Sequence, residues 1–155
     1  MSEELEKVCE TLDKLTLDAL TLMEEQIQLK LSLENAMVAG ESNLAKTRYI
    51  LGQNSVSVLQ LPSEDAEMTA NVKVVDKSEK YLDCKAVEIQ KCGGEDVPNP
   101  LKWFGVLVPQ NLHNAQKMFT QAINYVVDSV NVQRKLEETC VKLKQLKEYK
   151  KELLG

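Results

Sequence analysis

The sequence is poor in the residues on which most enzymes, metal sites and disulfide-bonded folds depend. Its 155 residues include one histidine, four prolines, four cysteines and 5% aromatic residues. The cysteines, at positions 9, 84, 92 and 140, show neither the spacing of a disulfide framework nor a pair typical of zinc binding. His113 alone supplies no histidine-rich metal site and no serine–histidine–aspartate relay. We therefore expect that the protein is not an enzyme and needs no metal or other cofactor.

Long apolar runs are also missing, and acidic residues are in excess. No stretch of about 18 uncharged apolar residues occurs, so the sequence predicts no membrane span. The chain has 24 acidic and 19 basic residues, a net charge of −5, which disfavours nucleic acid as the main partner. It starts with Glu3, Glu4 and Glu6, whereas a signal peptide starts with positive charge. These features predict a cytosolic, reducing location.

Aliphatic residues, by contrast, are abundant and fall at helical spacing. Over the first part of the chain they recur in alternating steps of three and four, which is the seam of a coiled coil. The seam positions are Leu5, Val8, Leu12, Leu15, Ala19, Leu22, Gln26, Leu29, Leu33 and Ala36. We predict one helix over residues 3–51, ended by Gly52 and roughly 70 Å long at 1.5 Å per residue. Gly40 falls on the same seam and marks either a close approach of two backbones or a kink.

A second apolar stripe lies off this seam. It consists of Leu17, Leu20, Ile27, Leu31 and Val38. A helix with one neighbour needs only a narrow apolar face, so the wider face predicts a second partner. That partner is either another chain or the middle segment of this protein, and the alternative is that these side chains are simply exposed. If it is another chain, we expect Leu20, Ile27 and Leu31 to bind it.

The last part of the chain repeats the pattern. Its seam positions are Leu112, Ala115, Phe119, Ala122, Val126, Ser129, Gln133, Leu136, Cys140 and Leu143. With Asn111 as the N-cap, we predict a second helix over residues 111–153. Residues 1–41 hold ten acids and three lysines (net −7), and residues 134–155 hold seven bases and four acids (net +3). This asymmetry favours antiparallel pairing of the two helices, with acids beside bases. Alternatively, the basic tail contacts RNA or anionic lipid, although its interspersed acids favour a solvated helix face.

Residues 52–110 break the helical period and join the two helices. Short β-branched runs at 56–61, 72–75 and 86–89 predict two or three small strands. The whole chain, residues 1–155, is therefore predicted to be a single domain of mainly α class. Its two long helices form an antiparallel coiled-coil hairpin with a small irregular or β middle segment.

One stretch of the middle segment, residues 100–109, is apolar apart from Lys102. It contains the only tryptophan, Trp103, followed by Phe104, and is bracketed by Pro100 and Pro109. Two interpretations remain open. The stretch plugs the apolar surface of the hairpin, or it forms a docking patch in which the two aromatic side chains anchor another protein.

Two motifs resemble those of a known family. The run LAKTRY (44–49) ends the first predicted helix, and the run PLKWFGVLVP (100–109) precedes the second. With the flanking coiled coils, they resemble the coiled-coil family of vacuolar proton-ATPase (V-ATPase) assembly factors. Residues 62–97 show no motif that can be assigned, and the resemblance implies that this segment varies within the family.

The resemblance implies a non-enzymatic assembly chaperone. Such a protein binds a small membrane-embedded assembly factor and, with it, the large membrane subunit of the proton-translocating sector. It works at the cytosolic face of endoplasmic-reticulum, early secretory and endosomal or lysosomal membranes, reached through its partners, and its loss impairs organelle acidification. The motif positions carried over as docking or structural residues are Leu44, Ala45, Arg48, Tyr49, Pro100, Trp103, Phe104, Gly105 and Pro109.

Two other functions fit the pattern. A prefoldin-like chaperone subunit also consists of a helix, a small β region and a helix, but it uses its strands to form a hexamer. A nucleic-acid-binding coiled coil would use the basic tail, and its binding would depend steeply on salt.

Overall fold

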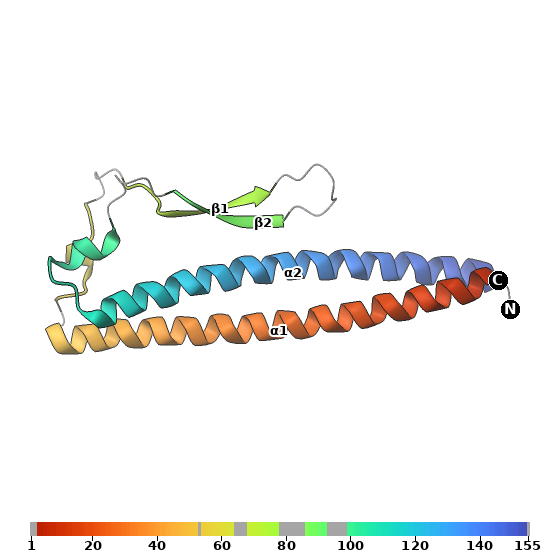
Figure 1. Cartoon of the computed structure of the whole chain (residues 1–155), viewed down its shortest axis with the longest axis horizontal. Coiled ribbons are helices and arrows are strands. Elements are labelled where there is room, and N and C mark those ends of the chain that lie inside the picture. Colours follow the sequence, from red (N-terminus) through yellow and green to blue (C-terminus); the bar gives the residue numbers. More distant parts are fainter. Residues whose placement is uncertain (1–2, 53, 64–67, 78–85, 93–98, 155) are drawn as a thin grey trace.

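Two long helices lie side by side and antiparallel along the molecule. The computed structural model describes residues 3–52, 54–63, 68–77, 86–92 and 99–154. Helix α1 spans Glu3–Leu51 and helix α2 spans Gln110–Leu154. Figure 1 shows both termini at one end of the rod, the open end, and the connection between the helices at the other, the closed end. The mainly α fold class is confirmed, and the helix ends differ from the predicted ones by no more than one residue.

The helices meet through small side chains that allow their backbones to come close. Ala36 of α1 and Ala115 and Ala122 of α2 are all buried. A Cβ atom added to Gly40 would lie 2.8 Å from the ring of Phe119, well inside van der Waals contact. Gly40 therefore marks a close approach to α2, and α1 continues through it as a regular helix.

The predicted seam of α1 faces α2. Val8, Leu12, Ala19, Gln26 and Ala36 are buried there. The polar seam residue Gln26 has one of its two side-chain polar groups hydrogen-bonded, because its Nε2 donates to Oγ of Ser129 at 3.0 Å. The buried Oε1 of Gln26 has no hydrogen-bond partner. Such a pair stabilises little, but it fixes the register of the two helices.

The predicted seam of α2 is wrong at three of its ten positions, all from Val126 onward. Residues 115, 122, 129, 136 and 143 are buried or half-buried as expected, but Val126, Gln133 and Cys140 are exposed. In place of Val126, Gln133 and Cys140, the preceding residues face α1: Val132 is buried, and Tyr125 and Thr139 are half-buried. Gln133 instead donates to Glu137 on its own helix. The apolar Val126 misled the prediction because α2 has apolar residues on two faces, one for α1 and one for the strands.

The middle segment forms a two-stranded hairpin that lies along α2 (Figure 1). Strand β1 (Val72–Lys77) pairs antiparallel with strand β2 (Ala86–Lys91), with Val74 opposite Ile89. Asn131 of α2 anchors the hairpin, because its side chain accepts a hydrogen bond from the Val87 N–H (2.8 Å) and donates one to the Val87 carbonyl (2.9 Å). Arg134 of α2 pairs with Asp76 at 3.5 Å. The strands therefore pack on α2, and the described part of the middle segment leaves the second stripe of α1 exposed.

Two short 3₁₀ helices lie at the closed end of the rod. The first, η1 (Val58–Gln60), lies in the run 56–61, the third of the predicted strand candidates. Within the described residues the sheet therefore has two strands, the lower of the two predicted numbers. The second, η2 (Pro100–Phe104), starts at Asn99. The Asn99 side chain accepts hydrogen bonds from the Leu101 N–H and from Gln116 of α2, which ties η2 to that helix.

Candidate protein-docking surfaces

The first candidate surface is the apolar stripe on the side of α1 that faces away from α2, called here the outer stripe. It consists of Leu17, Leu20, Ile27, Leu31 and Val38, whose exposed fractions lie between 48% and 65%. These side chains follow each other at steps of three, four or seven, so they form one line along about six turns of helix. Isolated exposed leucines are common, but a continuous line of them is typical of a surface that binds another helix.

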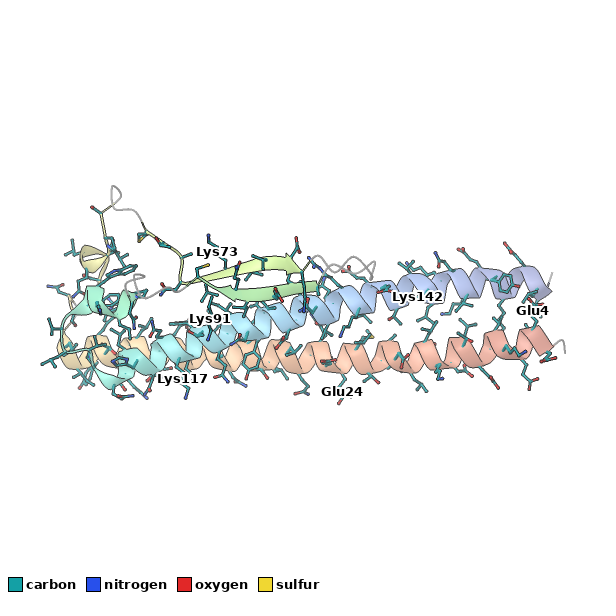
Figure 2. All side chains as sticks on the ribbon, turned by 45° about the horizontal axis from the view of Figure 1, so that its top comes forward. Glu4, Glu24, Lys73, Lys91, Lys117 and Lys142 are labelled. Atoms are coloured by element: carbon teal, nitrogen blue, oxygen red, sulfur yellow. The ribbon has the colours of Figure 1, made fainter. Side chains whose placement is uncertain are left out.

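Two glutamates complete the spacing of the outer stripe. Glu24 falls between Leu20 and Ile27, and Glu34 falls between Leu31 and Val38. With them the outer stripe recurs in regular steps of three and four. Figure 2 shows the labelled Glu24 side chain pointing away from α2. A second copy of α1 would bring these acids against more acids, whereas a helix with basic residues would neutralise them.

The second candidate surface is an apolar groove between the hairpin and the two long helices. It has a volume of about 510 Å³. Its lining comes from α1 (Leu33, Met37), from the strands (Val72, Val74, Val87) and from α2 (Phe119, Ala122, Ile123, Val126, Val127, Val130). Every lining side chain is apolar, so the groove suits an apolar side chain of a partner and supplies no group for catalysis.

The third candidate surface is the tip patch, a set of exposed apolar side chains at the closed end. It consists of Tyr49 and Ile50 at the end of α1, Val58 and Leu59 in η1, and Val106 and Leu107 after η2, with exposed fractions from 63% to 100%. The loop that carries the last two is turned outward at Gly105, whose φ of 126° is rarely adopted by other residues. Its base is fixed, because Leu101 is 6% exposed against the neighbouring helices.

The two sequence motifs meet at this closed end, although about 50 residues separate them in the chain. LAKTRY forms the last turns of α1, and PLKWFGVLVP forms η2 and the link into α2 (Figure 1). The half-buried motif residues are Leu44, Pro100, Trp103, Phe104 and Pro109. The exposed ones are Ala45, Arg48, Tyr49 and Gly105. The aromatic stretch is therefore partly packed and partly exposed, so features of both interpretations are present.

At the open end, acidic residues of α1 lie beside basic residues of α2. The Tyr149 hydroxyl of α2 donates a 2.7 Å hydrogen bond to Glu4 of α1, and this carboxylate raises the pKa of Tyr149 above its usual value of 10.0. The acidic start of α1 thus lies beside the basic end of α2. Within the described residues, no three His, Cys, Asp or Glu side chains are grouped to hold a metal, and no helix is long and apolar enough to cross a membrane. His113 is exposed, and Cys84 lies outside the described residues.

Leu20, Ile27 and Leu31 are exposed on the side of α1 away from the seam, and their binding of another chain stays a prediction. The groove is not predicted from the sequence. The signal for it was present, since Val72 and Val74 alternate on one face of a strand and Ile123, Val126 and Val130 recur at helical spacing beside the seam. Each pattern is short, and only the packing of the hairpin on α2 brings the two together. The exposed Val106 and Leu107 were read as part of one continuous patch, and the turn at Gly105 separates them from Trp103.

Comparison with known proteins identifies relatives that match most of the chain. The chain is 30% identical over 167 residues to the vacuolar ATPase assembly protein VMA22 of Homo sapiens, covering 92% of both proteins. It is 29% identical over 168 residues to the protein of the same name from Mus musculus, covering 93% of both. The protein of that name from Bos taurus is 28% identical over 154 residues, covering 83% of this chain and 86% of the relative. No family model matches the chain.

Proposed function

This chain belongs to the family of the vacuolar ATPase assembly protein VMA22, and from that premise we propose that it assists assembly of the vacuolar proton-pumping ATPase without catalysing a reaction. The observation that carries the mechanism is the outer stripe. The seam of α1 is buried against α2, and the β-hairpin of β1 and β2 covers part of α2. The outer stripe is therefore free to hold a helix of another protein.

The partner helix has a definite chemistry in this proposal. It carries apolar residues at steps of three and four, to match the stripe from Leu17 to Val38, and basic residues opposite Glu24 and Glu34. Burial of half-exposed side chains stabilises such a complex moderately, which suits a factor that releases its client when assembly is complete. The groove of about 510 Å³ provides a second place for an apolar side chain of the same partner.

The client in this proposal is the membrane sector of the pump. The resemblance of the LAKTRY and PLKWFGVLVP motifs supports a small membrane-embedded assembly factor as the direct partner and the large membrane subunit as the client. Assembly would then take place at endoplasmic-reticulum, early secretory and endosomal or lysosomal membranes, and loss of the protein would impair organelle acidification. Among the motif residues, the half-buried Trp103 and Phe104 support the closed end, and the exposed Arg48 and Tyr49 are available for contact.

A complementation experiment tests this function. Cells that lack the protein are supplied with the wild-type chain or with the variant Leu20→Glu/Ile27→Glu, which puts two further charges on the outer stripe. The wild-type chain should restore the assembled V-ATPase and an acidic organelle pH, and the variant should restore neither at equal protein level. The matched control is Val141→Glu, because Val141 is exposed to 52% on α2, away from the stripe. Full rescue by the stripe variant would contradict the proposal.

A further inference from the structure

We propose that the tip patch binds an anionic membrane surface directly, so that the protein contacts lipid at its closed end as well as a partner helix along α1. This goes beyond the proposed function, in which the protein reaches membranes through other proteins. The tip patch differs from the outer stripe in how far its side chains stand out. Val58, Leu59, Val106 and Leu107 are 82–100% exposed, whereas the stripe residues are only about half exposed.

The tip patch is built from three separate segments at the end of the rod. The end of α1, η1 and the loop after η2 each contribute an adjacent pair of apolar residues (Figure 1). A single exposed valine is ordinary, but three pairs of exposed apolar residues at one end of a molecule are typical of a site that binds an apolar surface. The loop of Val106 and Leu107 is held outward by a fixed base, since Asn99 ties η2 to Gln116 of α2.

Among the described residues at this end, the charge has the sign that an anionic membrane attracts. Residues 42–63 and 99–127, which include the whole patch, contain no acidic residue although the chain as a whole has a net charge of −5. Their basic residues are Lys46, Arg48, Lys102 and Lys117. The acids of 64–67 and 93–98 lie outside the described residues. Exposed aliphatic side chains and a tyrosine, combined with lysine and arginine, are the composition of a segment that lies in the membrane interface.

The shape of the tip favours a lipid surface over a protein partner. The end of α1, η1 and the loop after η2 lie together at the closed end of the long axis (Figure 1), and their six apolar side chains are 63–100% exposed, so a broad lipid surface suits them better than a single narrow helix. Beside the patch lies a hollow of about 410 Å³ lined by Ala45, Arg48, Tyr49 and Gly52. It offers room for a lipid headgroup next to the Arg48 guanidinium, while Tyr49 and Ile50 contact the acyl boundary.

Vesicle binding of the full-length chain tests the proposal, with Trp103 as a built-in reporter because it is the only tryptophan. The wild-type protein should sediment with vesicles of phosphatidylcholine and phosphatidylserine, and Trp103 fluorescence should shift to the blue. Vesicles of phosphatidylcholine alone should bind at least several-fold less. The variant Val106→Ser/Leu107→Ser removes side chains that are almost fully exposed, so it should fold normally and bind on the order of tenfold less.

Two control variants locate the binding. Leu17→Ser/Val38→Ser removes comparable side chains from the outer stripe and should leave vesicle binding unchanged. Lys147→Glu/Lys151→Glu reverses two charges of the basic tail at the opposite end and should also leave vesicle binding unchanged. The proposal is overturned if the wild-type chain does not bind the vesicles, if the tip variant binds like the wild type, or if only the tail variant loses binding. It is equally overturned if the tip variant loses a protein partner while vesicle binding persists.

Discussion

Substitution of the outer stripe should weaken partner binding strongly and folding hardly at all. The informative variant is Leu20→Gln/Ile27→Gln/Leu31→Gln, which keeps the side-chain length and good helix propensity while replacing apolar surface. In the free protein these three side chains are 58%, 58% and 48% exposed. Because they make few contacts with α2, we expect each substitution to change the free energy of unfolding by no more than about 0.5 kcal/mol.

The effect on binding follows from the area that is still exposed. Full burial of a leucine or isoleucine side chain stabilises by about 1.5–3 kcal/mol, and about half of each of these side chains remains to be buried. The three residues together therefore contribute about 2–5 kcal/mol to a complex, which corresponds to between about 50-fold and several thousand-fold in the dissociation constant.

The assay combines affinity with placement. Affinity is measured by titrating the purified chain into detergent-solubilised membranes and capturing the V-ATPase membrane subunits, and a photo-crosslinker at position 27 or 141 reports which surface is in contact. We expect crosslinks to a pump subunit or its membrane-embedded assembly factor from position 27 only. A loss of less than about threefold in affinity, with unchanged stability, would refute the docking role of the stripe. Crosslinks from position 141 alone would refute its location.

Three further outcomes follow from the contacts. Gly40→Ala should lower the free energy of unfolding by about 1–2 kcal/mol in urea titrations, because the new Cβ meets the Phe119 ring, and the same change in a Phe119→Leu background should be neutral or stabilising. The raised pKa of Tyr149 means that its contact with Glu4 stabilises the fold below the unfolded-state pKa of about 10, and that this contribution is lost as pH rises through the folded-state pKa. Tyrosinate absorbance of the wild type, compared with a Tyr149→Phe variant, should therefore assign Tyr149 a pKa above its usual value, and Glu4→Gln should lower it. In gel filtration the purified chain should elute as a small elongated species, since its strands are bonded to its own α2, and a hexamer would favour the prefoldin-like alternative.

The sequence was sufficient for the helices and insufficient for what packs on them. The three–four spacing predicted the span of α1 within a residue, because a coiled-coil seam is a local pattern repeated over many turns. The seam of α2 was misassigned at Val126 and Gln133, because apolar residues that face the hairpin are indistinguishable in sequence from those that face α1. The place where the β-hairpin docks depends in part on Asn131, a polar side chain that no periodicity singles out.

The unequal covering of the two helices supports the proposed docking surface on α1. Both helices carry more apolar surface than one neighbour can bury, so each requires a second contact. Helix α2 obtains it within the chain, through the two hydrogen bonds of Asn131 to β2 and the pairing of Arg134 with Asp76. Within the described residues the outer stripe of α1 has no such cover, and Glu24 and Glu34 in its line oppose pairing with a second copy. Asn131→Ala combined with Arg134→Ala removes the two hydrogen bonds and the ion pair that hold the β-hairpin on α2, while the stripe stays intact. Partner capture that survives this change and fails in the stripe variant would therefore assign the binding energy to α1.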